Sequence, residues 1–284
     1  YTLSLHGALP ILAAGKRVEL EEQAKHIVQN AQREADSVLK EARLEAKDLV
    51  FQAKAEWEKE QKAKLAELSA MEKRLCELGC NEVVITGGIY RFWSGIPYDL
   101  PPAIRFFQKN GFVLDHKVMD LIVFFNGEAR NEPPLSSGFE LRKADYNDIG
   151  ALFMFEQAEF PNWVSSMTAM IAAGDIDNII TIWHKNTLIG TVQSYTPKSK
   201  WRGPNVVWER ILGERLGGLG CVGIAKSWRG KGLGDCLCKG ALRHIAMEGA
   251  SSCLIDWTNL TEFYHKTCNA VMWKEFLRGT KKIK

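Results

Sequence analysis

The longest uninterrupted pattern in the chain is residues 16–75, which contain neither Gly nor Pro and carry equal numbers of acidic and basic side chains. Without a helix breaker, this segment predicts one helix of about 60 residues, roughly 90 Å long. Small apolar residues return along it at spacings of three and four: Ala31, Ala35, Val38, Ala42, Ala46, Leu49 and Ala53. So narrow a stripe cannot bury a core of its own, so we expect residues 12–78 to form a charged coiled coil, self-associating or lying along a partner.

The rest of the chain, from about Cys80, has the composition of a globular domain. Its apolar runs are far shorter than the ~20 residues that a membrane span needs, so no membrane partner is expected. A net charge of +3 is too small to predict a nucleic-acid partner. Seven cysteines form no C-x-x-C pair, which argues against a disulfide framework or a metal site and favours the reducing cytoplasm.

Apolar runs and turn residues in the globular part predict a mixed α/β fold. A hairpin is expected where two apolar runs meet across His184 to Asn186. The segment 128–138 is a linker by composition. Other predicted strands are 81–87, 117–125, 139–144, 218–225, 251–257 and 271–277. Short helices are predicted over 101–112, 148–160, 163–174 and 261–266. Together they predict one mixed sheet of strands with helices between them.

A loop with a glycine at every second position, Arg229-Gly230-Lys231-Gly232-Leu233-Gly234, precedes an apolar-periodic helix that should begin near Gly232 and end at Gly249. Backbone amides and a helix N-terminus together predict an anion site. A P-loop is excluded because Lys231 is followed by Gly232. A second pattern, G-x-G-x-x-G at residues 218–223, lacks the helix that a dinucleotide-binding fingerprint requires.

The glycine loop resembles the R/Q-x-x-G-x-G/A pyrophosphate loop of the GNAT acyl-CoA N-acyltransferases. The resemblance implies the GNAT fold and an acetyl-CoA-dependent acyltransferase that acetylates a primary amine of a small molecule. Tyr264, about thirty residues after Gly234, stands where that family places the tyrosine beside the coenzyme sulfur. The residues expected to bind the coenzyme are Val222, Gly223, Ile224, Arg229, Gly230, Lys231, Gly232, Leu233, Gly234 and Asp235.

Direct transfer of an acetyl group requires a proton for the departing thiolate and an uncharged amine. Tyr264 is the expected acid, and backbone amides around residues 221–223 are expected to stabilise negative charge on the thioester oxygen. The base is expected among Asp256, Glu209 and Glu262, acting through water, although any one of them taken alone is more often an ordinary surface or structural carboxylate. One departure from the family pattern follows Tyr264, where residues 268–270 read Cys-Asn-Ala instead of a glycine and an aromatic residue.

The amino-acid sequence of residues 139–279 resembles the C-terminal half of tandem-GNAT proteins, which suggests an amino sugar such as glucosamine as the acceptor. Residues 79–127 resemble the end of a preceding, truncated half in which Phe107 replaces the tyrosine, and residues 280–284 form a basic tail. The helix over 12–78 resembles the N-terminal coiled coil of ribonuclease Y, but no His-Asp dipeptide exists for that nuclease's metal site. Residues 1–11 resemble a translated sequencing adapter. The alternative function is a non-catalytic CoA-binding or coiled-coil scaffold protein.

Overall fold

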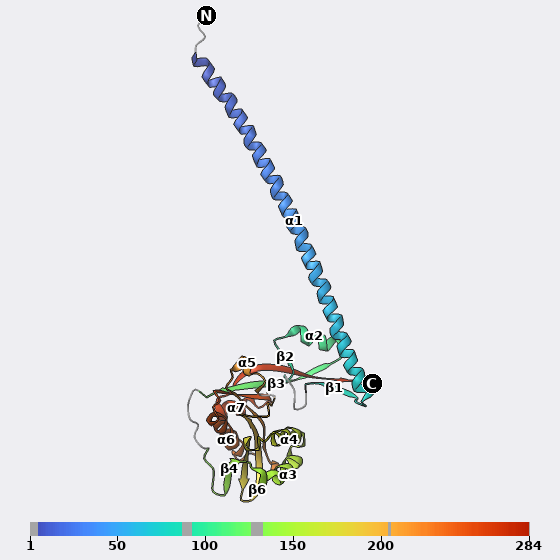
Figure 1. Cartoon of the computed structure of the whole chain (residues 1–284), viewed down its shortest axis with the longest axis vertical. Helices are drawn as coiled ribbons and strands as arrows, with labels where there is room; N and C mark the ends of the chain where they lie inside the picture. Colours follow the sequence, from blue (N-terminus) through green and yellow to red (C-terminus); the bar gives the residue numbers. More distant parts are fainter. Residues whose placement is uncertain (1–4, 87–92, 126–132, 204–205, 284) are drawn as a thin grey trace. The chain divides into compact units, whose positions relative to one another are not determined.

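The computed structural model describes residues 5–86, 93–125, 133–203 and 206–283, with the backbone alone for 5–21 and 24 (Figure 1). Residues 1–4 of the adapter-like leader and 128–132 of the predicted linker lie outside the described residues. The chain divides into two compact units, Tyr1–Leu78 and Gly79–Lys284. In the described part, no helix combines the length and the apolar character that a bilayer crossing requires.

The first unit is a single helix, α1, which spans Leu5–Glu77. It begins earlier than the predicted range 12–78 because it continues back through Pro10, which lies outside that range. Extending an existing helix adds one hydrogen bond for each residue ordered, so isolated unfavourable residues near its end are absorbed. The apolar side chains of the predicted stripe are open to solvent, with Val38 64% and Leu49 61% exposed.

The second unit is built on one mixed sheet in the order β1-β9-β3-β8-β7-β6-β5-β4, with β2 paired to β9 outside that path. Neighbouring strands are antiparallel except β7 and β8, which are parallel. The predicted hairpin is β5 and β6. The strands are β1 Glu82–Ile85, β2 Ile96–Pro97, β3 Val113–Phe124, β4 Phe139–Lys143, β5 Ile179–His184, β6 Thr187–Tyr195, β7 Leu216–Ile224, β8 Ser252–Thr258 and β9 Val271–Lys282.

Helices cover both faces of this sheet (Figure 1). The helices are α2 Pro101–Lys109, α3 Ile149–Glu159, α4 Val164–Ala173, α5 Glu209–Leu212, α6 Leu233–Met247 and α7 Thr261–Cys268, with short 3₁₀ turns η1 Tyr146–Asp148, η2 Pro161–Trp163, η3 Ile176–Asn178 and η5 Lys226–Trp228. On one face, α6 and α7 enclose a core that includes Leu237 and Ile245. On the other, α3 and α4 enclose a second core around Leu152 and Met170.

Strands from residues 79–127 and from residues 139–282 share this sheet. The β3 strand lies between β8 and β9, where Leu121 pairs with Ile255 and Val118 with Phe276. Val118 and the residues from Asp120 to Val123 are buried, as expected where a strand is central, whereas the first five residues of β3 are mostly exposed. The segment that resembles a truncated first half therefore completes the sheet of the second.

The end of the chain also differs from the prediction. The residues predicted as a basic tail, 280–284, are strand as far as Lys282, because β9 continues into an antiparallel pairing with β1. The backbone N–H of Ile283 then donates to the carbonyl of Asn81 at 2.9 Å. The short basic sequence alone suggested a solvated tail. Its strand pairing could not be predicted locally, because the partner strand β1 lies about 200 residues earlier in the chain.

Candidate active site

The glycine loop leads from β7 into α6 with two glycines in the left-handed conformation. Gly230 has φ +78° and Gly232 φ +77°, a region that costs residues with a Cβ about 1–2 kcal/mol. Gly232 is the N-cap of α6, and Gly249, with φ +98°, follows its last turn. Both ends of this helix therefore lie where the sequence predicted them.

Most backbone amides of this loop are unpaired. In the described part of the chain, the N–H groups of residues 230–234 have no hydrogen-bond acceptor, whereas Arg229 donates to Lys226 O at 3.5 Å and Asp235 donates to Gly232 O at 3.1 Å. The dipole of α6 adds roughly half a positive charge at the same end. A run of free amides at the start of a 15-residue helix can bind a phosphate group.

Two basic side chains accompany these amides. The Arg229 Nε atom donates to the carbonyl of Ile224 at 2.9 Å, which ties the loop to the end of β7. The Lys231 Nζ atom lies 4.4 Å above the ring of Trp228, a cation–π contact. Asp235, in the first turn of α6, pairs with Lys239 at 2.8 Å. The loop thus combines free donors with positive charge.

The parallel strands β7 and β8 separate beside this loop. They pair only from Leu216 with Ser252 to Leu219 with Ile255, although β7 continues to Ile224 and β8 to Thr258. The pairing ends where the residues expected to contact the coenzyme begin. Beyond Leu219, no pairing of β7 with β8 is present in the described residues.

On its other side, β7 pairs with β6 through a bulge. Thr191 is opposite Gly223 and Gln193 is opposite Gly220, so two residues of β7 face one residue of β6. Cys221, inside the bulge, has φ +52°. A Cβ on Gly223 would lie 2.4–2.7 Å from the rings of Phe160 and Trp163, so glycine is required there. The bulge bends β7 at the place where it leaves β8.

Tyr264 lies in α7 with only 6% of its surface exposed, and its ring meets Phe263 edge-on at 5.0 Å between centroids. Burial is the main cause that raises the pKa of Tyr264 above its ordinary value, and the charges of Cys238, Cys268, Asp256 and Cys221 add to it. The phenol is therefore protonated at neutral pH and close to the β7 bulge. It can act as a proton donor.

The unusual residues after Tyr264 preserve the turn that closes α7. Asn269 is the C-cap, with φ +56° and ψ +33°, and its N–H donates to the carbonyls of His265 and Tyr264. Asparagine enters the left-handed region more readily than other residues with a side chain. The departure from the family's glycine therefore leaves the backbone of this turn intact.

The three carboxylates expected as bases lie in different places. Asp256 is on β8, near enough to Tyr264 for its charge to raise the pKa of the phenol. Glu209 forms an ion pair with Arg202 and follows Trp208, which packs with Leu216 at the other end of β7. The Glu262 side chain is 88% exposed and pairs with Lys266 at 3.5 Å. Of the three, the structure brings Asp256 alone to the tyrosine.

Aromatic side chains pack a small core beside the start of β7. Trp208 stacks on Trp93 with 6.1 Å between ring centroids and meets Trp273 edge-on at 5.1 Å. These indoles cover Leu216 and Leu254.

Sequence reasoning missed one carboxylate, Glu156 on α3, which is only 1% exposed. Desolvation raises the pKa of Glu156 to about 7, although a hydrogen bond from Thr191 opposes the shift. The sequence did hold a signal, because Glu156 follows Leu152 by four residues and so lies on the apolar stripe of its helix. A charged residue on that stripe is unusual.

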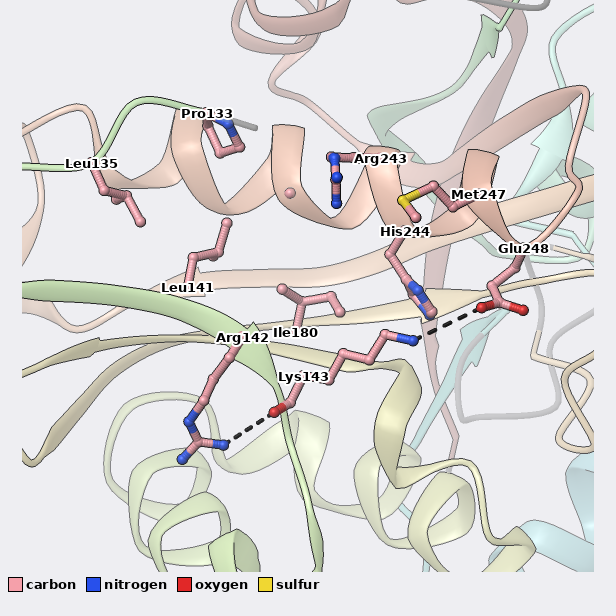
Figure 2. A pocket seen from close by; sticks show the side chains of 11 residues that line it. Pro133, Leu135, Leu141, Arg142, Lys143, Ile180, Arg243, His244, Met247 and Glu248 are labelled. Carbon is pink, nitrogen blue, oxygen red and sulfur yellow. Dashed lines mark hydrogen bonds and ion pairs between the residues drawn. The ribbon is translucent and has the colours of Figure 1, made fainter. Parts of the chain in front are cut away.

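A cavity of about 250 Å³ lies apart from the glycine loop (Figure 2). Its wall is the C-terminal half of α6, with Arg243, His244 and Met247, and part of β4. Burial lowers the pKa of His244 to about 4, and its Nε2 atom lies 2.8 Å from Asn178 Oδ1, so this histidine is a neutral packing group. Figure 2 shows Lys143 directed toward Glu248, with which it pairs at 3.8 Å.

Comparisons with known proteins give a family match to the N-terminal helix and structural matches to acetyltransferases. Residues 11–79 match the RNase Y N-terminal region. A fungal glucosamine N-acetyltransferase region, GCN5-related and part of a multi-domain GH3 β-N-acetylglucosaminidase, superposes with a TM-score of 0.69 at 24% identity, over 74% of this chain. The chain contains a GNAT fold. No curated protein matches the sequence.

Two more GNAT structures are similar to the chain. A GCN5-related N-acetyltransferase from Sphaerobacter thermophilus has a TM-score of 0.51 at 16% identity, over 66% of this chain and 58% of its own. A tandem GNAT protein from the clavulanic acid biosynthesis pathway has a TM-score of 0.50 at 12% identity, over 76% of this chain and 69% of its own. The chain spans about a quarter of the fungal protein's length. At these identities the likeness establishes the fold.

Proposed function

We propose that the GNAT unit is an acetyl-CoA-dependent N-acetyltransferase that acts on a primary amine of a small molecule. The observation that carries the proposal is the row of unpaired amides at residues 230–234, beside the point where β7 leaves β8. A pyrophosphate fits these donors, since it offers several acceptor oxygens and negative charge to a helix N-terminus. Arg229, Lys231 and Leu233 would border the pyrophosphate, and Val222 to Ile224 the arm that leads to the thioester.

The residues around this gap match the demands of acetyl transfer. Acetyl-CoA supplies an activated acetyl thioester when bound. Tyr264 holds a proton within α7 and would donate it to the leaving sulfur. Amides of the β7 bulge, at residues 221–223, would donate to the thioester oxygen, a contribution of about 3 kcal/mol for each donor in other enzymes. Asp256, on the neighbouring strand, would help orient the phenol.

The acceptor is proposed to be an amino sugar. The support is the fungal region described as a glucosamine N-acetyltransferase, which has the highest TM-score of the three structures compared. An amino sugar offers a primary amine together with hydroxyl groups, so its pocket needs a carboxylate and polar donors near the bulge. Buried polar groups on α3 and β6 are of this kind.

Thiol release from acetyl-CoA, measured against a panel of primary amines, tests the function. We expect release that depends on the acceptor, with glucosamine among the active amines. Coenzyme binding without any acceptor-dependent release would refute the enzymatic proposal and favour a CoA-binding scaffold. Mass spectrometry of the product, with a gain of one acetyl group on nitrogen, identifies the bond formed.

A second role is favoured by the exposed apolar stripe of α1. We propose that this helix self-associates, since Val38 and Leu49 are more than half exposed on a helix that has no core of its own. The match of residues 11–79 to the RNase Y N-terminal region adds support. Light scattering on the full chain should give a mass above that of one chain. A monomer at all concentrations would refute the role.

A further inference from the structure

A row of polar side chains runs along one face of β6. Thr191, Gln193 and Tyr195 alternate on the strand, so they point to the same side, and none is more than 2% exposed. Glu156 on α3 and Ser166 on α4 reach this row. Burying so many polar groups is costly unless each has a partner.

Two atoms in this row have no hydrogen-bond partner among the described residues. Glu156 accepts from the Thr191 hydroxyl at 2.6 Å through Oε1, but its Oε2 atom is unpaired. Gln193 accepts from Ser166 at 2.6 Å and from Tyr195 at 3.2 Å through Oε1, but its Nε2 atom is unpaired. A buried polar atom without a hydrogen-bond partner destabilises the fold, so a ligand that bonds to both atoms would remove this cost.

The row lies directly against the β7 bulge. Thr191 pairs with Gly223 and Gln193 with Gly220, so the two unpaired atoms are anchored at the residues on either side of the bulge. Tyr264 belongs to the core on the other face of the sheet. It lies near enough to Cys221, in the same bulge, for the charge of that residue to act on its phenol. An acceptor held by Glu156 and Gln193 would therefore meet a thioester held beyond the bulge.

Given the proposed function, on which this inference depends, we propose that Glu156 is the general base and that Gln193 Nε2 hydrogen-bonds an acceptor oxygen. The acceptor is then an amino alcohol, whose ammonium group meets the free carboxylate oxygen and whose neighbouring hydroxyl meets the free amide. A simple alkylamine can bond only to the carboxylate of Glu156 and leaves the amide of Gln193 unpaired. The enzyme should therefore prefer amino alcohols to simple alkylamines.

The proton and electron balance is simple. The Glu156 carboxylate takes one proton from the acceptor ammonium and later releases it to water. The nitrogen lone pair forms a C–N bond with the acetyl carbonyl carbon, and the C–S bond breaks with its electron pair on sulfur. Tyr264 protonates this sulfur and regains a proton from the nitrogen through water. The products are an N-acetyl amine, a free thiol and one proton.

Few titratable groups surround Glu156, so it should titrate alone. The elements packed on α3 contribute Tyr195 from β6, and Tyr146 and Asp148 from η1; Asp148 is held by Arg142 at 2.6 Å. The packed segments α4 and η2 carry no titratable residue. On α3 itself, Glu159 accepts from the Lys226 backbone N–H at 2.9 Å. The raised pKa therefore reflects burial rather than a neighbouring charge.

The test measures thiol release with glucosamine and with cyclohexylamine, from pH 5.5 to 9, and coenzyme affinity by calorimetry. Glu156→Gln should lower kcat about 10²-fold or more and remove the acid limb of the profile near pH 7, with coenzyme affinity unchanged. Glu156→Asp should restore part of kcat. Gln193→Leu should raise KM for glucosamine and leave KM for cyclohexylamine unchanged. Glu248→Gln, at the far end of α6, is the control.

The outcomes separate the two proposals. If the wild-type protein turns over an amine but Glu156→Gln keeps the wild-type pH profile, the assignment of the base is overturned and the proposed function stands. If Gln193→Leu changes KM for both amines equally, the assignment of the acceptor oxygen is overturned. If the wild-type protein releases no thiol with any amine, the proposed function fails, and this inference fails with it.

Discussion

Replacing Glu156 by glutamine should stabilise the protein at alkaline pH. The pKa of Glu156 is raised from 4.5 to about 7 in the folded chain, because burial disfavours its charged form. The unfolded chain therefore loses this proton more readily than the folded one. The contribution of Glu156 to stability is highest below pH 4.5 and is lost as the pH rises through 7. Glutamine keeps the shape and the acceptor for Thr191 but has no charge to bury.

The size of the effect follows from the two pKa values. Their difference of about 2.5 corresponds to about 3 kcal/mol. The free energy of unfolding of Glu156→Gln, relative to wild type, should change little near pH 4. It should then grow between pH 4.5 and 7 and level off about 3 kcal/mol higher at pH 8 and above.

Urea unfolding at a series of pH values from 4 to 9, followed by tryptophan fluorescence, measures this difference. Glu248→Gln is a control of opposite sign, because a hydrogen bond from Lys198 lowers the pKa of Glu248. That substitution should slightly destabilise the protein at neutral pH. A difference between Glu156→Gln and wild type that stays constant from pH 4 to 9 would refute the account of a buried, uncompensated carboxylate.

Three other experiments test separate parts of the account. Tyr264→Phe should lower the rate of thiol release by about 10²-fold or more at unchanged coenzyme affinity; equal activity would exclude the phenol as the acid. Asn269→Val should lower the free energy of unfolding by about 1–2 kcal/mol because of the left-handed backbone, and Asn269→Gly should not; equal melting temperatures would argue against that conformation. Removing residues 1–75 should abolish self-association and leave coenzyme binding intact. A loss of coenzyme binding would show that the GNAT unit needs the helix.

Local chemistry made part of the site predictable from the sequence. Gly230 and Gly232 favour a loop and would destabilise a helix, so the sequence placed the start of α6 near Gly232, and α6 begins at Leu233. Tyr264 follows at the spacing that the GNAT pattern requires. The glycine loop and the position of Tyr264 could be predicted because both depend on residues that are close together in the sequence.

Long-range pairing could not be predicted in the same way. Nothing in the apolar pattern of β3 says that it lies between β8 and β9, because any central strand has the same pattern. The bulge at residues 221–222 depends on the register between β6 and β7, which periodicity does not specify. Glu156 accepts a hydrogen bond from Thr191, which pairs with Gly223 beside that bulge, so its proposed role can be inferred only when the strands are paired.

The most direct test of the coenzyme site is calorimetry of CoA binding to wild type, Gly232→Val and Gly249→Val. Both glycines have positive φ at the two ends of α6, so the substitutions impose similar strain. Displacing the phosphate from two amides should cost about 3 kcal/mol, or roughly 100-fold in affinity. We expect Gly232→Val to lose binding by that factor and Gly249→Val to bind as wild type. Wild-type affinity in both variants would contradict the placement of the pyrophosphate at this loop.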